Sequence, residues 1–297
     1  MKIFDCTTFY SEHLMMDLRF NILNDYVDKF IVCESTISHS GKKKKLNFDI
    51  NNYPKFKNKI SYIVIDEEPD GIIGEKKGLA EPYEKRSDSL KRINLSYDYM
   101  IKAISDASDN DLIILSDNDE IPNLNSKQFK NTKKEIIIFK QLFFYYKLNL
   151  LYDLIPWYGS KATKKKNLIS MSWLKNLKNK KYPIWRLDTL FSNTRYINLE
   201  IIDNGGWHFT NLMTAEKLYE KLTNFGHHDE FELSGMTVND LQKKINNKEV
   251  FFNHFVDKEK YKERWNFDYK LKKIEKDKLP NFLQLNETQL KYKEWFD

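Results

Sequence analysis

Residues 112–122, LIILSDNDEIP, constrain the fold of this chain more than any other segment. The first four residues are apolar, which is typical of a strand buried on both faces of a parallel sheet. Asp117, Asn118, Asp119 and Glu120 follow almost at once, and Pro122 then ends the extended pattern. Ligands bind at the carboxyl ends of the strands in open α/β sheets, so the segment predicts an acidic corner at a binding edge.

The segments before this strand alternate between strand and helix patterns. We expect strands over residues 2–9, 28–35 and 59–66, and helices with apolar side chains at helical spacing over residues 11–27 and 81–104. The order strand, helix, strand, strand, helix, strand is typical of an α/β fold with a mostly parallel sheet flanked by helices.

The pattern changes after Pro122. Residues 134–150 predict a long strand or a strand pair, and two later segments predict helices, over residues 214–225 and 237–252. Short strands or loops are expected over residues 168–174, 183–191 and 195–203. We expect one domain over residues 1–260 and a Lys- and aromatic-rich helical tail over residues 261–297, packed on or beside it.

Composition limits the class of protein and its partners. With 41% hydrophobic residues among 297, the chain can bury a sizeable core and is predicted to be globular. The net charge of +6 is compatible with a nucleotide, a nucleic acid or an acidic membrane face. Cys6 and Cys33 fall in predicted strands, where packing in a reducing compartment is the favoured interpretation.

The sequence also predicts a location. The first ten residues contain no long apolar run of the kind found in a signal peptide, and no stretch reaches the ~18 apolar residues of a membrane span. We therefore expect a cytoplasmic protein without a signal peptide or transmembrane segment, with the inner face of a membrane as a second possible location.

The acidic corner suggests a cation. Asp117, Asp119 and Glu120 would repel one another in solution, and each would raise the pKa of its neighbours. A divalent ion removes that repulsion, and hard oxygen ligands suit Mg²⁺ or Mn²⁺, which usually also hold substrate phosphates. A surface turn is the alternative, because Asp and Asn favour turns. The segment alone leaves both interpretations open.

Four segments in order resemble glycosyltransferase family 17. They are IFDCTTFYSEHLMMDLRFNILNDYVDKFIVCEST, ESTISHSGKKKKLNF, LIILSDNDEIP and NGGWHFTNLMTAEKLYEKLTNFGHHDEF, and together they span roughly residues 1–260. The resemblance implies a GT-A-like fold and an inverting transfer of GlcNAc from UDP-GlcNAc to a glycan acceptor, giving a β linkage. The Asp-x-Asp motif would then join Mn²⁺ (or Mg²⁺) to the donor diphosphate.

The metal candidates are Asp117, Asp119 and His208. Asp119 is the stronger of the two carboxylates, because the last Asp of such motifs usually ligates directly. His208 follows two glycines that allow close backbone approach, and its imidazole can ligate a metal or pair with phosphate. Trp207 either stacks on a sugar or fills the core.

Donor-binding candidates come from strand ends and from one helix: Thr7, Thr8, Phe9, Glu34, Arg92, Asp117 and Trp207. The end of the first strand is where a uridine would lie in a GT-A-like fold. Glu34 either accepts hydrogen bonds from ribose or uracil, or caps a strand end. Arg92 is preferred to Arg86 as a bidentate partner of the diphosphate, with a solvated helix face as the alternative.

An inverting transfer needs a base that takes the proton from the acceptor hydroxyl. Asp229 and Glu230, in the polar run HHDE, are two candidates, and Asp203 before the glycine pair is the third. An exposed loop after a helix is the competing interpretation for the first two.

The acceptor is expected to be an oligosaccharide or a lipid-linked glycan. The tail residues Tyr261, Trp265, Phe267 and Leu271 predict either a helix packed on the domain or a basic helix on an anionic membrane. One competing function is nucleic-acid binding through the basic surface, which the acidic corner disfavours because carboxylates repel phosphates. The other is a catalytically inactive nucleotide-sugar- or carbohydrate-binding protein of the same fold.

Overall fold

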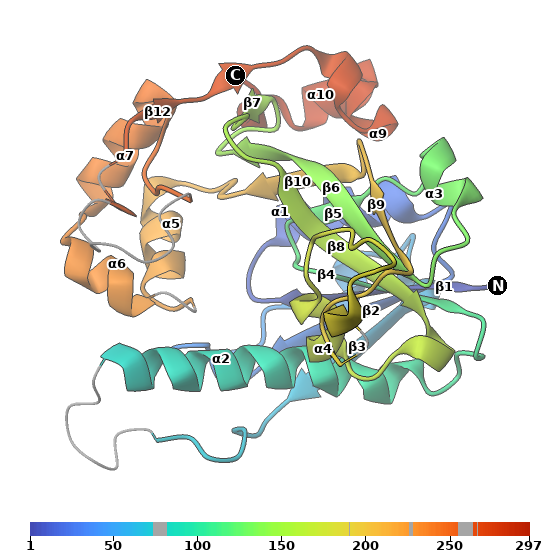
Figure 1. Cartoon of the computed structure of the whole chain (residues 1–297). Helices are drawn as coiled ribbons and strands as arrows, with labels where there is room; N and C mark the ends of the chain where they lie inside the picture. The colour runs from blue at the N-terminus through green and yellow to red at the C-terminus, as the bar shows by residue number, and fades with distance from the viewer. Residues whose placement is uncertain (74–81, 190, 226–227, 255–263, 266) are drawn as a thin grey trace.

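A mixed sheet of eleven strands forms the centre of the computed structural model (Figure 1). The structure describes residues 1–73, 82–189, 191–225, 228–254, 264–265 and 267–297. One half is a parallel run in the order β3-β2-β1-β4, formed by β1 (Ile3–Phe9), β2 (Lys29–Ser35), β3 (Ile60–Ile65) and β4 (Leu112–Ser116). The predicted α/β class, with a mixed sheet flanked by helices, is confirmed.

The other half of the sheet is built around a long strand. β6 (Ile136–Tyr145) pairs antiparallel with β8 (Trp157–Lys164), which in turn pairs antiparallel with β4. β9 (Leu199–Ile202) and β10 (Gly206–Thr210) lie parallel to β6. The remaining strands are β5 (Glu120–Pro122), β7 (Leu150–Leu151) and β13 (Lys272–Lys273).

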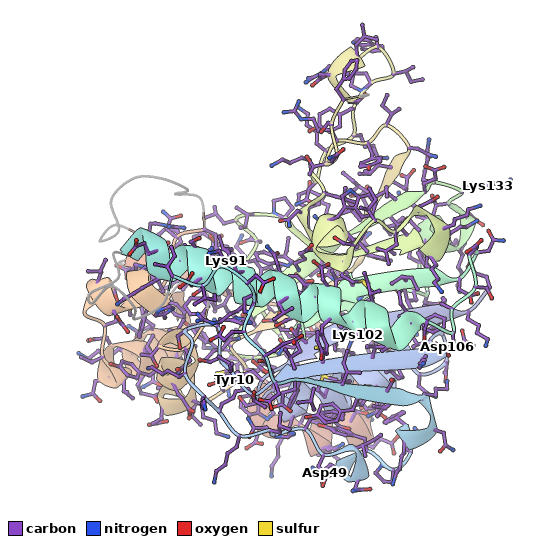
Figure 2. The ribbon with its side chains drawn as sticks, turned by 90° about the horizontal axis from the view of Figure 1, so that it is seen from below. Tyr10, Asp49, Lys91, Lys102, Asp106 and Lys133 are labelled. Atoms are coloured by element: carbon purple, nitrogen blue, oxygen red, sulfur yellow. The ribbon has the colours of Figure 1, made fainter. Side chains whose placement is uncertain are left out.

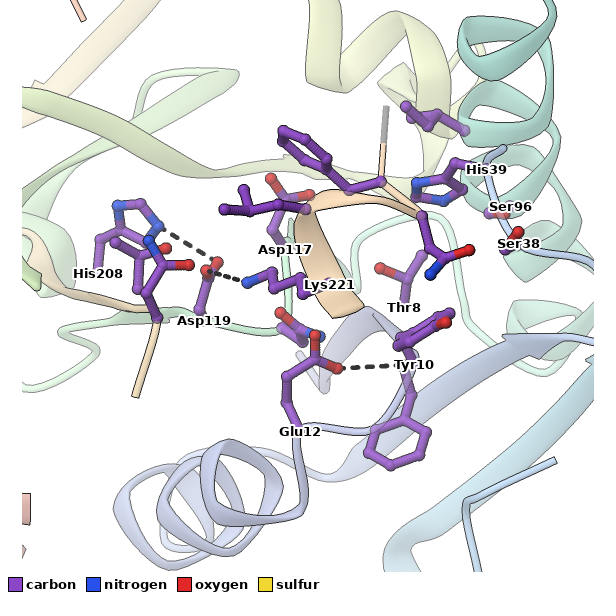
Figure 3. A pocket seen from close by; sticks show the side chains of 18 of the residues that line it. Thr8, Tyr10, Glu12, Ser38, His39, Ser96, Asp117, Asp119, His208 and Lys221 are labelled. Atoms are coloured by element: carbon purple, nitrogen blue, oxygen red, sulfur yellow. Dashed lines mark hydrogen bonds and ion pairs between the residues drawn. The ribbon is translucent and has the colours of Figure 1, made fainter. Parts of the chain in front are cut away.

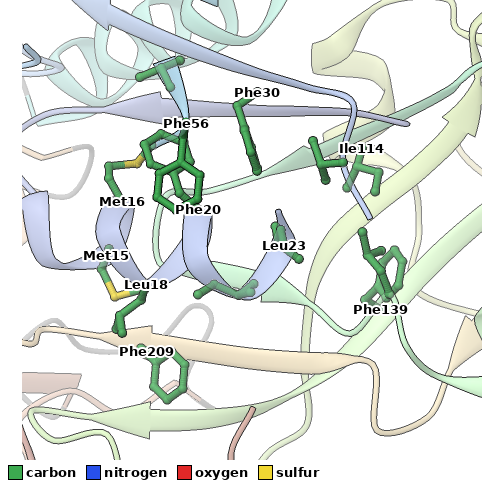
Figure 4. Close-up of a cluster of buried hydrophobic side chains, with 14 of the residues drawn as sticks. Met15, Met16, Leu18, Phe20, Leu23, Phe30, Phe56, Ile114, Phe139 and Phe209 are labelled. Carbon is green, nitrogen blue, oxygen red and sulfur yellow. The ribbon is translucent and has the colours of Figure 1, made fainter. Parts of the chain in front are cut away.

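Both faces of the parallel half are apolar, as the continuous run of β4 predicts. Leu112 and Ile114 point to the face covered by α1 (His13–Leu23), where Figure 4 shows the packed aromatic and methionine side chains. Ile113 and Leu115 point to the face covered by α2 (Pro82–Tyr99) and α4 (Met171–Asn176). Strand alternation therefore splits one apolar segment between two cores.

The two cysteines lie in this part of the core. Cys6 and Cys33 are both buried and both free thiols, as the sequence predicted. Burial raises the pKa of each thiol well above its ordinary value. Both side chains therefore behave as small apolar groups.

A third core lies beside the long strand, under a group of helices. It is covered by α5 (Ala215–Leu222), α6 (His228–Ser234) and α7 (Val238–Asn247), with the strand pair β11 (Glu249–Val250) and β12 (Tyr269–Lys270). In Figure 1 these helices lie to one side of the sheet, with α6 beside α2.

The remaining helical segments are short. They are α3 (Lys127–Asn131), α9 (Asn281–Gln284) and α10 (Asn286–Lys291), with the 3-10 turns η1 (Ile50–Asn52), η2 (Lys57–Lys59), η4 (Met100–Ile104), η5 (Lys165–Asn167), η6 (Leu187–Thr189), η7 (Lys276–Lys278) and η8 (Lys293–Trp295).

Two segments differ in type from their predictions. Residues 269–273 of the tail, which were expected to be helical, form β12 (Tyr269–Lys270) and β13 (Lys272–Lys273). Residues 168–174 were expected to be a short strand or loop, but most of them belong to α4. The side chain of Ser170 accepts a hydrogen bond from the Trp173 amide at 3.0 Å and so caps the helix. The sequence pattern missed this N-cap, which is the signal that starts short helices.

The tail returns to the main sheet. β13 pairs with β7, and Trp207 of β10 donates its indole N–H to the Lys278 carbonyl at 2.8 Å. Trp265 and Leu271 are buried in the third core. The predicted domain boundary at residues 260 and 261 and the side chain of Tyr261 lie outside the described residues. Within the described ranges, no helix is both long and apolar enough to cross a membrane.

Candidate active site

A cavity of about 670 Å³ opens at the carboxyl ends of β1, β2 and β4. Figure 3 shows Thr8 from the end of β1, Asp117 and Asp119 after β4, His208 from β10 and Lys221 from α5 around it. The acidic corner therefore lies at the sheet edge where the sequence placed a binding site.

The backbone of the acidic corner is fixed from below by a buried arginine. Arg19 of α1 forms a two-pronged ion pair with Asp5 of β1, and both side chains are fully buried. The remaining Arg19 nitrogen donates to the Glu120 carbonyl at 2.6 Å. Because a buried guanidinium needs its partners, this contact holds the loop after β4 in one conformation.

Glu120 holds the same loop from the inside. Its carboxylate accepts hydrogen bonds from the Asp117 amide at 2.9 Å and from the Trp157 indole at 3.0 Å. Glu120 is 1% exposed and does not line the cavity. Burial, with the nearby Asp117, raises its pKa above the ordinary value of a glutamate.

Asp117 is paired with a lysine that the sequence did not single out. Lys175, at the end of α4, lies 2.9 Å from the Asp117 carboxylate and 3.3 Å from that of Glu120. Burial raises the pKa of Asp117, but Lys175 and the hydrogen bond from Tyr97 at 2.7 Å outweigh it, so the net shift is downward. Asp117 is therefore held as a carboxylate.

The position of Lys175 depends on a second, buried lysine. Lys161 of β8 donates to the carbonyls of Lys175 and Leu177, each at 2.6 Å. Burial lowers the pKa of Lys161 to about 7. These two bonds hold the end of α4 against the sheet, with the Lys175 amine directed to the acidic corner.

Asp119 faces His208 and a lysine from α5. Its carboxylate lies 3.3 Å from His208 Nε2 and 3.9 Å from Lys221 Nζ (Figure 3). Burial raises the pKa of Asp119, but His208 and Lys221 more than offset this and hold the pKa far below its usual range. Asp119 is thus a carboxylate at any physiological pH.

His208 is fixed by two aromatic rings. It stacks on Trp157, with ring centroids 4.2 Å apart, and on Phe143, at 4.6 Å. Its Nδ1 is buried and has no hydrogen-bond partner in the described part of the chain. The stacking therefore orients the imidazole so that Nε2 points to Asp119.

Asp119 and His208 fit a divalent cation as two of its ligands. Two adjacent ligands about 2.1 Å from an octahedral ion lie about 3 Å apart, close to the 3.3 Å between Asp119 and His208. No group of three or more His, Cys, Asp or Glu side chains forms a metal site among the residues described. Phosphate and water oxygens would have to complete the coordination, as is usual for Mg²⁺.

The donor-binding candidates at the strand ends separate into two groups. Thr8 and Phe9 line the cavity, whereas Thr7 is buried in the sheet. Glu34 is fully buried outside the cavity wall and accepts hydrogen bonds from Tyr62 at 2.8 Å and from the Asn47 amide at 2.8 Å. Glu34 therefore anchors the segment after β2.

The two arginines of α2 have different surroundings. Arg86 lines the cavity. Arg92 pairs with Glu68 at 2.7 Å and donates to the His39 carbonyl at 3.2 Å, and it does not line the cavity. Gly41, with φ of +90°, lies against the Arg92 guanidinium, so Arg92 supports the loop after β2.

The remaining candidate site residues do not line the cavity, or have side chains outside the described residues. Trp207 points to the opposite side of β10 from His208, as strand alternation requires. Asp203 is exposed and pairs with Lys140 at 3.1 Å. Glu230 pairs with Arg264 at 2.9 Å, and Arg264 lines the cavity. The side chain of Asp229 lies outside the described residues.

One wall of the cavity is aromatic, and the sequence did not predict it. Its members come from β6, β8 and the chain after β11: Phe143, Tyr145, Trp157, Phe251, Phe252, His254 and Trp265. The Tyr145 hydroxyl is hydrogen-bonded to His254. Flat apolar rings of this kind can pack on the faces of sugar rings.

Comparison with known proteins gives a family. The model of glycosyltransferase family 17 matches residues 1–293. β-1,4-Mannosyl-glycoprotein 4-β-N-acetylglucosaminyltransferase of Rattus norvegicus is 27% identical over 125 residues, which is 41% of this chain and 22% of that protein. The Homo sapiens protein of the same name is 30% identical over 112 residues, 36% of this chain and 19% of that protein. The chain thus spans about a fifth of the length of these curated relatives.

Two solved structures illustrate the similarity found among known folds. HddC from Yersinia pseudotuberculosis, complexed with GMP-PN, has a TM-score of 0.31 at 11% identity, covering 68% of this chain and 91% of that one. A putative glucose-1-phosphate thymidylyltransferase from Bacillus anthracis has the same TM-score and identity, covering 68% and 86%.

Proposed function

This chain belongs to glycosyltransferase family 17, and from that membership we propose that it transfers GlcNAc from UDP-GlcNAc to a glycan acceptor with inversion, giving a β linkage. The observation that carries the proposal is the acidic corner at the end of β4. There Asp119 meets His208 and Lys221 inside a cavity that has room for a nucleotide sugar.

The charges around the cavity support a diphosphate donor. Lys44, Arg86, Lys221 and Arg264 line the wall together with the carboxylates of the acidic corner. Cations attract the donor diphosphate, whereas carboxylates alone would repel it. Lys221 lies against Asp119, and we propose that it moves to a phosphate oxygen when the donor enters.

Asp119 and His208 would hold Mn²⁺ or Mg²⁺ in this reaction. Such an ion, when bound, neutralises the charge that builds on the departing diphosphate oxygen. Asp117 has a different task in this proposal. Its carboxylate accepts a hydrogen bond from Tyr97 and pairs with Lys175, so Asp117 orients the loop and remains available to the donor ribose.

The transfer itself forms one bond and breaks one. The acceptor hydroxyl oxygen bonds to the anomeric carbon of the sugar, and the bond from that carbon to the UDP oxygen breaks. The hydroxyl proton passes to a base of the protein. Glu12 lines the cavity and so joins Asp229 and Glu230 as a candidate base, while the exposed Asp203 is the weakest of the candidates.

The aromatic wall supports a glycan acceptor. Trp157 and Phe143 already stack on His208, which places this wall next to the proposed metal ligands. An acceptor sugar packed on it would lie beside the donor. This arrangement also favours an enzyme over a nucleic-acid-binding protein, because the basic side chains line a concave cavity that also contains carboxylates.

A donor screen tests the proposal. The protein is incubated with a panel of UDP-sugars and Mn²⁺, and UDP release is measured with and without a chelator. We expect release from UDP-GlcNAc above all others, abolished by the chelator. Donor binding without turnover across an acceptor panel would support the inactive alternative, and no binding of any UDP-sugar would refute the proposal.

A further inference from the structure

Four large apolar side chains lie in solvent on one protruding segment, residues 178–189 and 191–195, which we call the arm. Ile184 is 82% exposed, Trp185 80%, Leu187 70% and Phe191 91%. In Figure 2 the arm, coloured yellow, stands clear of the sheet and its helices. Exposed apolar side chains gathered in this way mark an interaction surface.

The backbone of the arm is held by its own polar groups. At its base the Lys178 amide donates to the Thr194 carbonyl at 2.9 Å. Within the arm, Asp188 accepts hydrogen bonds from Arg186 at 2.6 Å and from Arg195 at 2.7 Å. The arm thus pairs its one carboxylate with two arginines, while its largest apolar side chains lie in solvent, which is unusual for a surface loop.

The charge of the arm identifies the partner. Residues 178–195 contain five Lys or Arg side chains and one carboxylate, Asp188, which is already paired with two arginines. Lys178, Lys180 and Lys181 precede the four apolar side chains in the chain and are exposed. Lys181 also pairs with Glu200 at 2.8 Å, so Lys178 and Lys180 are the lysines that face solvent without an ion pair in the described residues. Apolar and aromatic side chains surrounded by cations match the boundary between acyl chains and anionic headgroups. A second copy of the arm would bring the same positive charge and so be repelled.

We propose that the arm docks the protein on an anionic lipid surface. Trp185 and Phe191 enter the boundary between headgroups and acyl chains, and the flanking lysines contact lipid phosphates. The sequence left membrane contact of the tail open as an alternative to packing on the domain. Trp265 and Leu271 are 3% and 7% exposed, so the tail does not present these two side chains.

The arm follows α4 in the chain, close to a residue that contacts the cavity wall. It begins three residues after Lys175, whose amine pairs with Asp117. A docked arm therefore fixes the end of α4, which holds Lys175, relative to the lipid surface. If the proposed transferase activity holds, this placement suits an acceptor glycan carried on a lipid; docking itself does not depend on that activity.

Vesicle co-sedimentation of the full chain tests the proposal. The vesicles are phosphatidylcholine alone or phosphatidylcholine mixed with phosphatidylglycerol. We expect binding to the mixed vesicles only, weakened by salt, and a loss of at least about tenfold in the Trp185→Ser/Phe191→Ser double variant. Leu290→Ser, at a leucine of α10 that is 72% exposed, is the matched control and should bind like the wild type.

The two substituted side chains are exposed, so the double variant is expected to keep the thermal stability of the wild type. Its UDP release with a water-soluble acceptor should also be unchanged, which separates docking from catalysis. Wild-type protein that binds neither vesicle, or a double variant that binds as well as the wild type, overturns the proposal. The proposal is also overturned if light scattering finds a dimer for the wild type and a monomer for the double variant, because the arm would then be a contact between two copies of the chain.

Discussion

Replacing Lys175 by methionine removes the cation that separates two carboxylates. In the native protein its amine lies 2.9 Å from Asp117 and 3.3 Å from Glu120, which is 1% exposed. Breaking a buried pair by removing one partner costs about 3–5 kcal/mol. The Asp117 side chain is 35% exposed, so water screens the Lys175–Asp117 pair more than the Lys175–Glu120 pair. We therefore expect a loss of unfolding free energy at the lower end of that range, about 3 kcal/mol. For a chain of this size, that loss corresponds to a Tm lower by about 5 °C.

The pH dependence of this loss has a definite sign. The pKa of Glu120 is already raised by burial and by Asp117, and the loss of Lys175 raises it further. A carboxyl whose folded pKa exceeds its unfolded value stabilises the fold below the unfolded pKa, and this contribution is lost as pH rises through the folded pKa. The Lys175→Met variant should therefore be closer to the wild type in acid than in base.

Thermal unfolding followed by circular dichroism measures both effects. Lys178→Met is the matched control, because it makes the same substitution three residues later at an exposed position. Equal Tm values for Lys175→Met and Lys178→Met, or a Tm deficit of Lys175→Met that is larger at acidic than at alkaline pH, would contradict the proposed role of Lys175.

Two further substitutions test the geometry of the site. Gly206→Ala should abolish folding or lower the Tm steeply, because φ is +133° and a Cβ there would lie 2.1 Å from the Ile121 carbonyl oxygen. The control, Gly235→Ala, has φ of +69° and open space around it, and should cost only about 1 kcal/mol. Equal Tm values for the two variants would contradict the close contact of β5 and β10. Lys221→Met should weaken UDP binding in calorimetry by about tenfold. The Tm should change little, because the Lys221 amine is 3.9 Å from Asp119 and partly exposed. An unchanged affinity for UDP would exclude Lys221 as a phosphate contact.

The acidic corner was predictable because it is encoded locally. An apolar run long enough for a buried strand, followed by carboxylates and a proline, requires only the general rule for ligand sites in α/β sheets. The free cysteines and the order of the first strands and helices depend on the same local patterns. These features do not depend on knowing which faces of distant elements meet.

The partners of the corner were not predictable, because they depend on packing. Lys175 and Lys221 belong to a chain with 49 Lys or Arg residues, and nothing in their neighbours distinguishes them. Arg86 and Arg92 are six residues apart, so they lie on different faces of α2, and only the docking of that helix decides which reaches the cavity. Arg19 pairs with Asp5 across two elements, which no local pattern announces.

Aromatic residues in basic segments were the least informative about which segments are buried and which are exposed. Trp265 is in the tail and Trp185 in the arm, and both stand among lysines and other aromatic residues. The first is 3% exposed and the second 80%. Hydropathy describes both segments alike, and only the tertiary structure determines which of them is covered.

The most direct test of the account is metal-dependent donor binding at Asp119. Calorimetry with UDP-GlcNAc is run with Mn²⁺ and with a chelator on the wild type, Asp119→Asn and Asp203→Asn. Asp203→Asn is the control, because Asp203 is exposed and does not line the cavity. We predict that Mn²⁺ tightens binding to the wild type and to Asp203→Asn by at least about tenfold and has no effect on Asp119→Asn. Mn²⁺-dependent binding that survives in Asp119→Asn would contradict the proposed role of the acidic corner.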